Sequence, residues 1–390
     1  MENRGGERYP FPQNKGYQYG ILPDKSRDEM NGDMLRMYNK WKELYLTTEG
    51  CREGEYRVYG GEHYKGGTCS EGTGYGMLIS VFMACPDNNA HEEFDGIFRF
   101  YKNHLVKGIG LMQWVTDKNG VSLSDGVAPD GDLDVTAALL LAHRQWGSNG
   151  EIHYLEEAKT LIGRLMEYVV NKPQYTISRD QITDPEVHYL DFTMSAYQMP
   201  AWMRLFYEVT GDDEWTKVIR AVYGVFDYFY KLNPETGLAP YTFMAENLGP
   251  MKGKAYTFSF DSCRVPWRVA LDYLWNGPDE TGLSHDYPSR NAAWFARYME
   301  SIDWDFDRVN AAFDLDGTPY SEALSPRNIV GMMAPAALVD ESHRKLLEKS
   351  YAYLSGLELM RQWPGDYYQD ALAVLGMLTL TGNMPDLYRM

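Results

Sequence analysis

The stretch Val135-Thr-Ala-Ala-Leu-Leu-Leu-Ala142 is apolar at nearly every position. As a helix it would be apolar all round, and such a helix must be covered by other elements on every side. The stretches Tyr75 to Met83 and Ala371 to Leu380 have the same character. The sequence therefore predicts a buried inner set of helices that a second set must cover.

Amphipathic stretches along the chain are suited to form that cover. Two of them carry clear apolar stripes with helical spacing, namely Phe94, Ile97, Phe98, Tyr101 and Leu105, and Leu155, Ala158, Leu161, Ile162, Leu165, Met166 and Val169. Further helices are predicted near residues 27–45, 196–209, 213–231, 264–275, 288–301, 328–338 and 342–355. Strand signals are few and the Gly/Pro-rich joins are short. We therefore predict an all-α fold of about a dozen helices in a double ring, forming one domain over residues 1–390.

Composition narrows the class of partner. Lys plus Arg total 37 against 55 for Asp plus Glu, giving a net charge of −18 without a basic cluster. Phosphate backbones and anionic membrane surfaces are poor partners for such a chain, so we expect no nucleic-acid or membrane partner. The 30 Tyr and 10 Trp are suited to stacking on sugar rings or to filling a large aromatic core. No run approaches the roughly 20 apolar residues of a membrane span.

The sequence contains no metal or cofactor motif. The four cysteines show neither a zinc pattern nor a disulfide framework, although a bridge between Cys51 and Cys69 remains open. The aspartates at 130, 132 and 134 resemble the start of a calcium loop. Such a loop needs glycine where Val135 stands and glutamate where Leu141 stands. We therefore predict no metal ion and no cofactor.

Three acidic segments are candidates for chemistry. Glu71 stands among glycines before an apolar helix, where desolvation would keep it protonated as an acid; alternatively, the helix dipole simply stabilises it. Asp130 stands at the start of a buried helix and either caps that helix or points into a cleft. Asp261 is followed one helical turn later by Arg264. This spacing fits either a carboxylate that the arginine holds ionised or an ordinary helix-capping residue.

Taken together, these segments resemble glycoside hydrolase family 8. The resemblance spans nearly the whole chain, and its motifs keep the family's order. They are Tyr9-Pro-Phe-Pro-Gln-Asn14, Ser70-Glu-Gly-Thr-Gly-Tyr-Gly76, Ala128-Pro-Asp-Gly-Asp132 through Trp146, Asp261-Ser-Cys-Arg264 with Trp267-Arg268, and Tyr367-Tyr368 through Asn383.

The resemblance implies an (α/α)6 barrel with an open cleft at one end and an inverting mechanism. It places Glu71 as the proton donor, Asp261 as the base, and Asp130 as the aspartate that grips the distorted sugar. It also assigns substrate-binding positions, which are Trp114 as a stacking residue, Arg264 close to the base, Tyr367, Tyr368, Tyr197 and Asp132. Asp370 departs from the family's more familiar asparagine, which leaves the detail of the tyrosine subsite open.

The resemblance thus predicts a secreted or periplasmic enzyme, acting as a monomer, that cuts internal β-1,4 bonds of a plant polysaccharide. Xylan is the preferred substrate, which would make the protein an endo-1,4-β-xylanase. The alternatives are an endo-β-1,4-glucanase or lichenase, and a reducing-end exo-oligoxylanase in which the segment 317–325 would block the cleft. A non-catalytic glycan-binding protein is the competing class.

Overall fold

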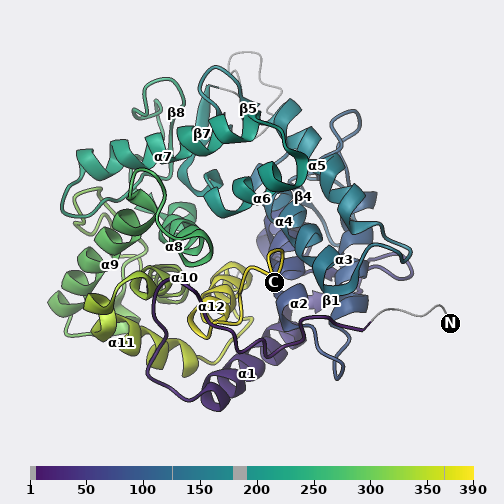
Figure 1. Cartoon of the computed structure of the whole chain (residues 1–390), viewed down its shortest axis with the longest axis horizontal. Helices are drawn as coiled ribbons and strands as arrows, with labels where there is room; N and C mark the ends of the chain where they lie inside the picture. The colour runs from purple at the N-terminus through teal and green to yellow at the C-terminus, as the bar shows by residue number, and fades with distance from the viewer. Residues whose placement is uncertain (1–5, 125, 179–190, 364) are drawn as a thin grey trace.

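A computed structural model describes residues 6–124, 126–178, 191–363 and 365–390. Within these residues, twelve α-helices form two concentric rings (Figure 1). The inner ring consists of α2 (Ser70–Met83), α4 (Pro129–Trp146), α6 (Pro200–Thr210), α8 (Val265–Asn276), α10 (Pro326–Met333) and α12 (Asp366–Leu380). The outer ring consists of α1 (Arg27–Tyr45), α3 (Ala90–Asn103), α5 (Tyr154–Tyr168), α7 (Glu214–Leu232), α9 (Leu283–Ser301) and α11 (Arg344–Ser355).

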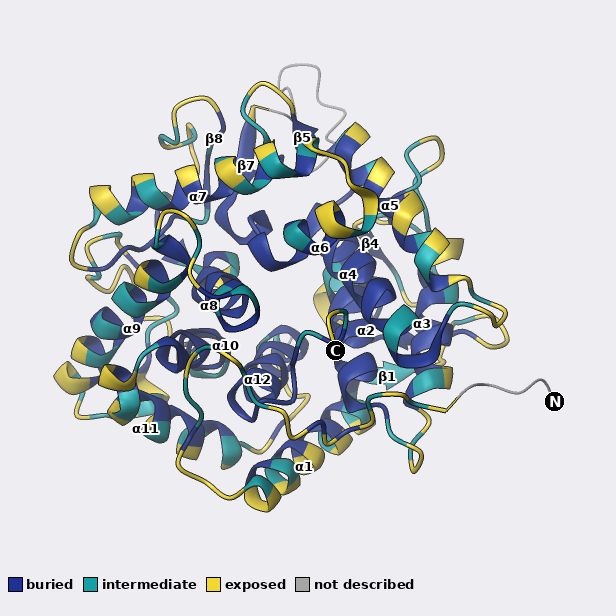
Figure 2. Cartoon of the chain, in the orientation of Figure 1, coloured by how far each residue is buried: buried dark blue, intermediate teal, exposed yellow. Residues whose placement is uncertain are grey.

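Burial separates the two rings as the sequence predicts (Figure 2). In α2, Glu71 is the only residue that is not buried, whereas α7 buries one apolar stripe and exposes its other face. The inner helices contact one another in the order α2, α4, α6, α8, α10, α12 and back to α2, and each outer helix packs against an inner neighbour. The predicted (α/α)6 barrel is therefore confirmed.

Short two-stranded sheets mark the end of the barrel at which the inner helices begin. The paired strands are β1 (Leu46–Thr47) with β2 (Arg57–Val58), β3 (Thr68–Cys69) with β4 (Val115–Thr116), β5 (Val170–Asn171) with β6 (Thr176–Ile177), β7 (Phe192–Met194) with β8 (Thr242–Met244), and β9 (Phe258–Ser259) with β10 (Ala312–Phe313). All five pairs are antiparallel. Strand β3 leads directly into α2. Two 3-10 turns, η2 (Ser195–Tyr197) and η3 (Phe260–Arg264), similarly connect β7 to α6 and β9 to α8.

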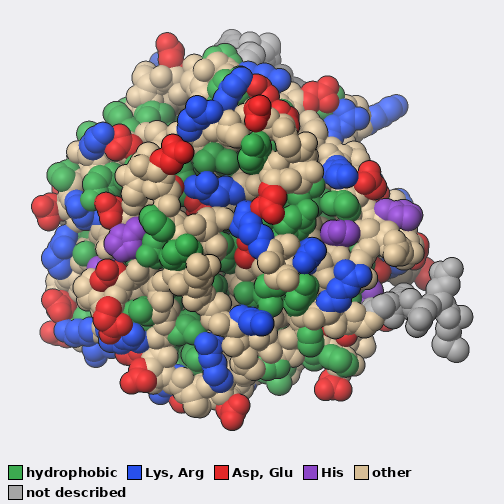
Figure 3. Space-filling view, in the orientation of Figure 1, with side chains coloured by type: hydrophobic (Ala, Val, Ile, Leu, Met, Phe, Trp, Pro, Cys, Tyr) green, Lys and Arg blue, Asp and Glu red, His purple; other side chains and the backbone are tan. Residues whose placement is uncertain are grey.

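The segment 6–26 covers the opposite end, which faces the viewer in Figure 1. Its backbone N–H groups at Arg8, Phe11 and Ile21 donate to carbonyls at the ends of α4, α2 and the 3-10 turn η5 (Ala334–Val339). Acidic and basic side chains are interspersed on this face (Figure 3). No helix in the described part of the chain is long and apolar enough to cross a membrane.

The cysteines answer a question that the sequence leaves open. All four, including Cys51 and Cys69, are free thiols. Cys69 is buried beside the first turn of α2, whereas Cys51 lies in the turn between β1 and β2. The two thiols serve different parts of the fold and form no disulfide.

Candidate active site

The first turns of α2 and α4 pack directly on each other because glycine stands at the crossing. A Cβ atom added to Gly131 would lie 2.3 Å from the carbonyl carbon of Ser70 and 2.7 Å from the backbone nitrogen of Glu71. Only glycine permits so close a backbone contact. The contact places Glu71, one residue after the start of α2, beside Asp130, one residue after the start of α4.

The third carboxylate comes from the turn that precedes α8. In η3, the backbone N–H of Ser259 donates to the Ser262 hydroxyl at 2.7 Å as part of a capping box. This arrangement fixes the turn that carries Asp261 and Arg264. The predicted partnership is present, because the Arg264 guanidinium forms an ion pair with Asp261 Oδ1 at 3.1 Å.

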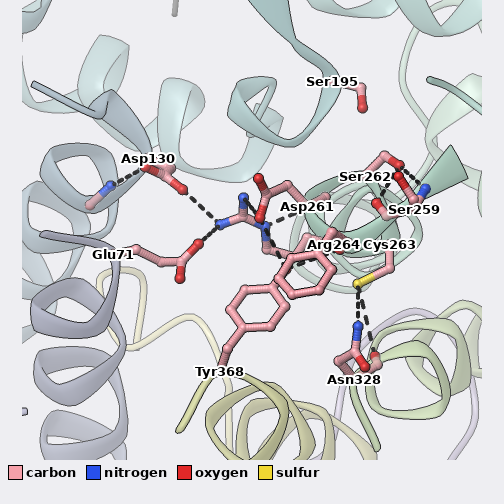
Figure 4. A network of polar contacts seen from close by, with 12 residues as sticks. Glu71, Asp130, Ser195, Ser259, Asp261, Ser262, Cys263, Arg264, Asn328 and Tyr368 are labelled. Atoms are coloured by element: carbon pink, nitrogen blue, oxygen red, sulfur yellow. Dashed lines mark hydrogen bonds and ion pairs between the residues drawn. The ribbon is translucent and has the colours of Figure 1, made fainter. Parts of the chain in front are cut away.

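Arg264 collects all three carboxylates on one guanidinium (Figure 4). Its Nη1 atom donates to Glu71 Oε2 at 2.8 Å, to Asp130 Oδ2 at 2.7 Å and to the Tyr75 hydroxyl at 2.7 Å, while Nη2 faces Asp261. The arginine side chain is fully buried, whereas the Asp261 side chain is 17% exposed and that of Glu71 12%. Arg264 therefore lies behind the carboxylates and holds them, and its predicted role as a substrate-binding residue stays a prediction.

Burial sets the protonation of the two carboxyls that meet at the helix crossing. Desolvation raises the pKa of Glu71 well above its ordinary value; Arg264 opposes this, while Asp130 and Asp261 add to it. Desolvation likewise raises the pKa of Asp130, again against the effect of Arg264. A carboxyl group with a raised pKa keeps its proton nearer to neutral pH, which is the property a general acid requires.

The start of α12 supplies two tyrosines to the same site. The Tyr367 hydroxyl donates to Glu71 Oε1 at 3.0 Å. The Tyr368 hydroxyl lies 3.0 Å from the Phe260 carbonyl oxygen and 3.3 Å from Asp261 Oδ1. Each candidate catalytic carboxylate at 71 and 261 therefore has its own phenol partner.

These groups line a cavity of about 300 Å³. Of the predicted site residues, it brings together Glu71, Asp130, Asp261, Trp114, Tyr197, Tyr367 and Tyr368. Its wall also contains residues that the sequence did not single out, among them His63, Tyr64, Cys69, Met194, Tyr241 and Phe260. A larger cavity of about 680 Å³ at the opposite end has one acidic side chain, Asp386, in its wall. It therefore offers no acid and base pair.

The three aspartates of α4 point to different partners. Asp130 reaches Arg264, whereas Asp134 pairs with Arg268 at 2.6 Å and accepts from Trp202 Nε1 at 2.8 Å. Asp132 is completely buried and accepts from the Tyr101 hydroxyl at 2.6 Å and from the Met112 N–H at 2.9 Å. Asp132 thus anchors the segment before Trp114, and its predicted binding of substrate stays a prediction.

An (α/α)6 barrel whose aromatic cavity contains a glutamate of raised pKa and a second carboxylate fits a hydrolase of glycosidic bonds. The chain belongs to the glycosyl hydrolases family 8, whose model matches residues 17–286. It is 30% identical to "Endoglucanase 2" of Ruminiclostridium josui, over 98% of this chain and 78% of that one. A reducing end xylose-releasing exo-oligoxylanase of Halalkalibacterium halodurans is 28% identical over 80% of this chain and 79% of its own length. Among solved structures, the β-1,3-1,4-glucanase of Paenibacillus sp. X4 superposes with a TM-score of 0.87 at 28% identity, covering 97% of this chain and 99% of that one.

Proposed function

We propose that this enzyme is an inverting endo-β-glucanase that hydrolyses internal β-1,4 bonds of a plant β-glucan. The observation that carries the proposal is the placement of Glu71 and Asp261 on separate nitrogens of one buried guanidinium, in the wall of an aromatic cavity. The two contacts, at 2.8 and 3.1 Å, limit the nearest carboxylate oxygens to within about 8 Å of each other. This upper limit admits the roughly 6.5–9.5 Å of inverting pairs and also the roughly 5–5.5 Å of retaining pairs, so the inverting part of the proposal rests on the family resemblance.

In the proposed mechanism, Glu71 protonates the leaving glycosidic oxygen. Its raised pKa keeps the required proton, and the Tyr367 hydroxyl stabilises the carboxylate that remains after transfer. Asp261 accepts a proton from the water that attacks the opposite face of the sugar, and its ion pair with Arg264 holds this carboxylate in place. Asp130 hydrogen-bonds the distorted sugar, adding stabilisation that is largest near the transition state. No covalent intermediate forms.

Glucan replaces xylan as the preferred substrate. The relatives that match over 96–98% of this chain include proteins named endoglucanase and β-glucanase, whereas the exo-oligoxylanase of Halalkalibacterium halodurans matches over 80%. Xylan stays as the second candidate because of that more distant relative. The names of these relatives, endoglucanases among them, support endo action over exo action. Because a polysaccharide does not enter the cell, we propose that the enzyme is secreted or periplasmic. We also propose that it acts as a monomer.

Product analysis tests the substrate and the class together. The enzyme is incubated with barley β-glucan, carboxymethyl-cellulose, xylan and chitosan in parallel. We expect a rapid fall in viscosity and mixed oligosaccharides from the two glucans. Faster turnover of xylan would overturn the glucan assignment, and release of single xylose units would point to exo action. Sugar binding without any turnover would identify a glycan-binding protein.

The anomeric configuration of the first product tests the mechanism. Proton NMR of a fresh β-glucan digest should show the α-anomer first, with the β-anomer appearing only by mutarotation. Asp261→Asn should abolish this reaction, because an amide accepts no proton from water. An initial β-anomer would indicate a retaining enzyme and would remove Asp261 from the role of base.

A further inference from the structure

A buried thiol contacts the proton donor through a single intermediate residue. The Sγ atom of Cys69 lies 3.0 Å from the Tyr367 hydroxyl, and that hydroxyl lies 3.0 Å from Glu71 Oε1. Cys69 comes from the end of β3 and Tyr367 from α12, so the fold brings these groups together from residues 298 positions apart. Cys69 also belongs to the cavity wall.

Proton counting fixes the direction of this chain when Glu71 is ionised. A phenol has one proton, and Tyr367 uses it to donate to Glu71. The oxygen of Tyr367 must therefore accept from Cys69, whose thiol stays protonated because burial raises its pKa. The sulfur itself faces the backbone N–H of Gly72 at 3.4 Å. The donors thus run from Gly72 through Cys69 and Tyr367 to the carboxylate of Glu71.

Helix capping alone does not account for the thiol. Cys69 occupies the N-cap of α2, where serine, threonine, aspartate and asparagine are the preferred residues. Its capping contact with the Gly72 N–H is 3.4 Å, an ordinary length for a sulfur acceptor, and the same sulfur also lies 3.0 Å from the Tyr367 hydroxyl. The second of these contacts is the one directed at the proton donor.

We propose that Cys69 is a positioning residue that acts through Tyr367 on Glu71 and thereby helps to set the pH above which the enzyme loses activity. The inference rests on the proposed role of Glu71 as general acid. A donor chain directed at Glu71 favours its ionised form. The other titratable or charged groups that face Glu71 or Tyr367 are Arg264 and Asp261 from η3, Asp130 from α4, Tyr75 from α2, and His63 and Tyr64 from the 3-10 turn η1 (Glu62–Tyr64).

The test is the pH dependence of kcat/KM on barley β-glucan. Cys69→Ala removes the thiol donor, so Glu71 should hold its proton to higher pH. The basic limb of the profile should move upward by about 0.5 pH unit, or about threefold in proton affinity. Cys69→Ser keeps a donor and should leave the limb within about 0.2 pH unit of the wild type. Cys85→Ala, just beyond the other end of α2, is the matched control for loss of a thiol and should not move the limb.

A second variant separates positioning from simple support of the fold. If Cys69 acts through Tyr367, adding Cys69→Ala to Tyr367→Phe should shift the limb no further than Tyr367→Phe alone. Melting temperatures are measured alongside, and Cys69→Val serves if the alanine variant does not fold. A lower melting temperature with an unmoved limb, or additive shifts in the double variant, would overturn the proposal. Turnover retained by Glu71→Gln would instead overturn the proposed function.

Discussion

The glycine at the crossing of α2 and α4 gives a sharp test of how the site is built. In Gly131→Ala the new Cβ would meet the Ser70 carbonyl carbon at 2.3 Å and its oxygen at 2.4 Å. Ordinary contacts between such atoms are about 3.5 Å, so the two backbones must separate by about 1 Å. Overpacking of this kind costs about 1–3 kcal/mol of unfolding free energy. A shift of about 1 Å between Glu71 and Asp130 should lower kcat about 10²-fold.

Urea unfolding and steady-state kinetics on barley β-glucan measure both effects. Gly163→Ala is the matched control, since it is an exposed glycine inside α5 whose added Cβ meets nothing within 4 Å. That variant should gain about 0.5–1 kcal/mol from helix propensity and keep its kcat. Wild-type kcat and stability in Gly131→Ala would refute the view that this close contact positions the acid.

Three further substitutions test individual side chains. Glu71→Gln should lower kcat by about 10²–10⁴-fold while calorimetry still detects oligosaccharide binding, and retention of more than about a tenth of kcat would argue against the acid role. Trp114→Ala removes a ring that is 38% exposed in the cavity wall, so KM should rise about tenfold with little change in melting temperature. An unchanged KM with a much lower melting temperature would show that the ring belongs to the core. Burial raises the pKa of Asp132 to about 7, so this group stabilises the fold at low pH and loses that contribution as pH rises through about 7. Asp132→Asn should therefore make the melting temperature fall less steeply between pH 5 and 8. A fall as steep as in the wild type would contradict this assignment.

Helix periodicity predicted the rings well, because a helix buried on one face has apolar residues at helical spacing and a helix buried on all faces is apolar at nearly every position. The start of α2 was harder to predict from the sequence. The apolar run begins at Tyr75, but the helix begins at Ser70, through residues that include two glycines. Glycine disfavours helix in isolation, and the close packing on α4 overrides that preference. This packing, which the local sequence does not reveal, is what places Glu71 on a rigid element.

The site was predictable residue by residue but not as a network. The i+3 spacing pointed from Arg264 to Asp261, yet the same guanidinium also binds carboxylates 193 and 134 positions away. Helix geometry could have separated Asp130 from Asp132, because residues two apart point to nearly opposite sides of a helix. Tyr75 could have been found as well, since it follows Glu71 by one turn on the same face. His63 and Tyr64 lie in a short 3-10 turn without periodicity, so no comparable signal marked them.

The contact that closes the inner ring also has a consequence during synthesis. Helix α2 leaves the ribosome long before α12, which covers one of its flanks. Until then the nascent chain exposes apolar surface that no earlier helix covers. Contacts between such distant segments form slowly, and uncovered apolar surface promotes aggregation. We therefore expect the unfinished chain to depend on chaperones, and a chain truncated before residue 366 to be insoluble.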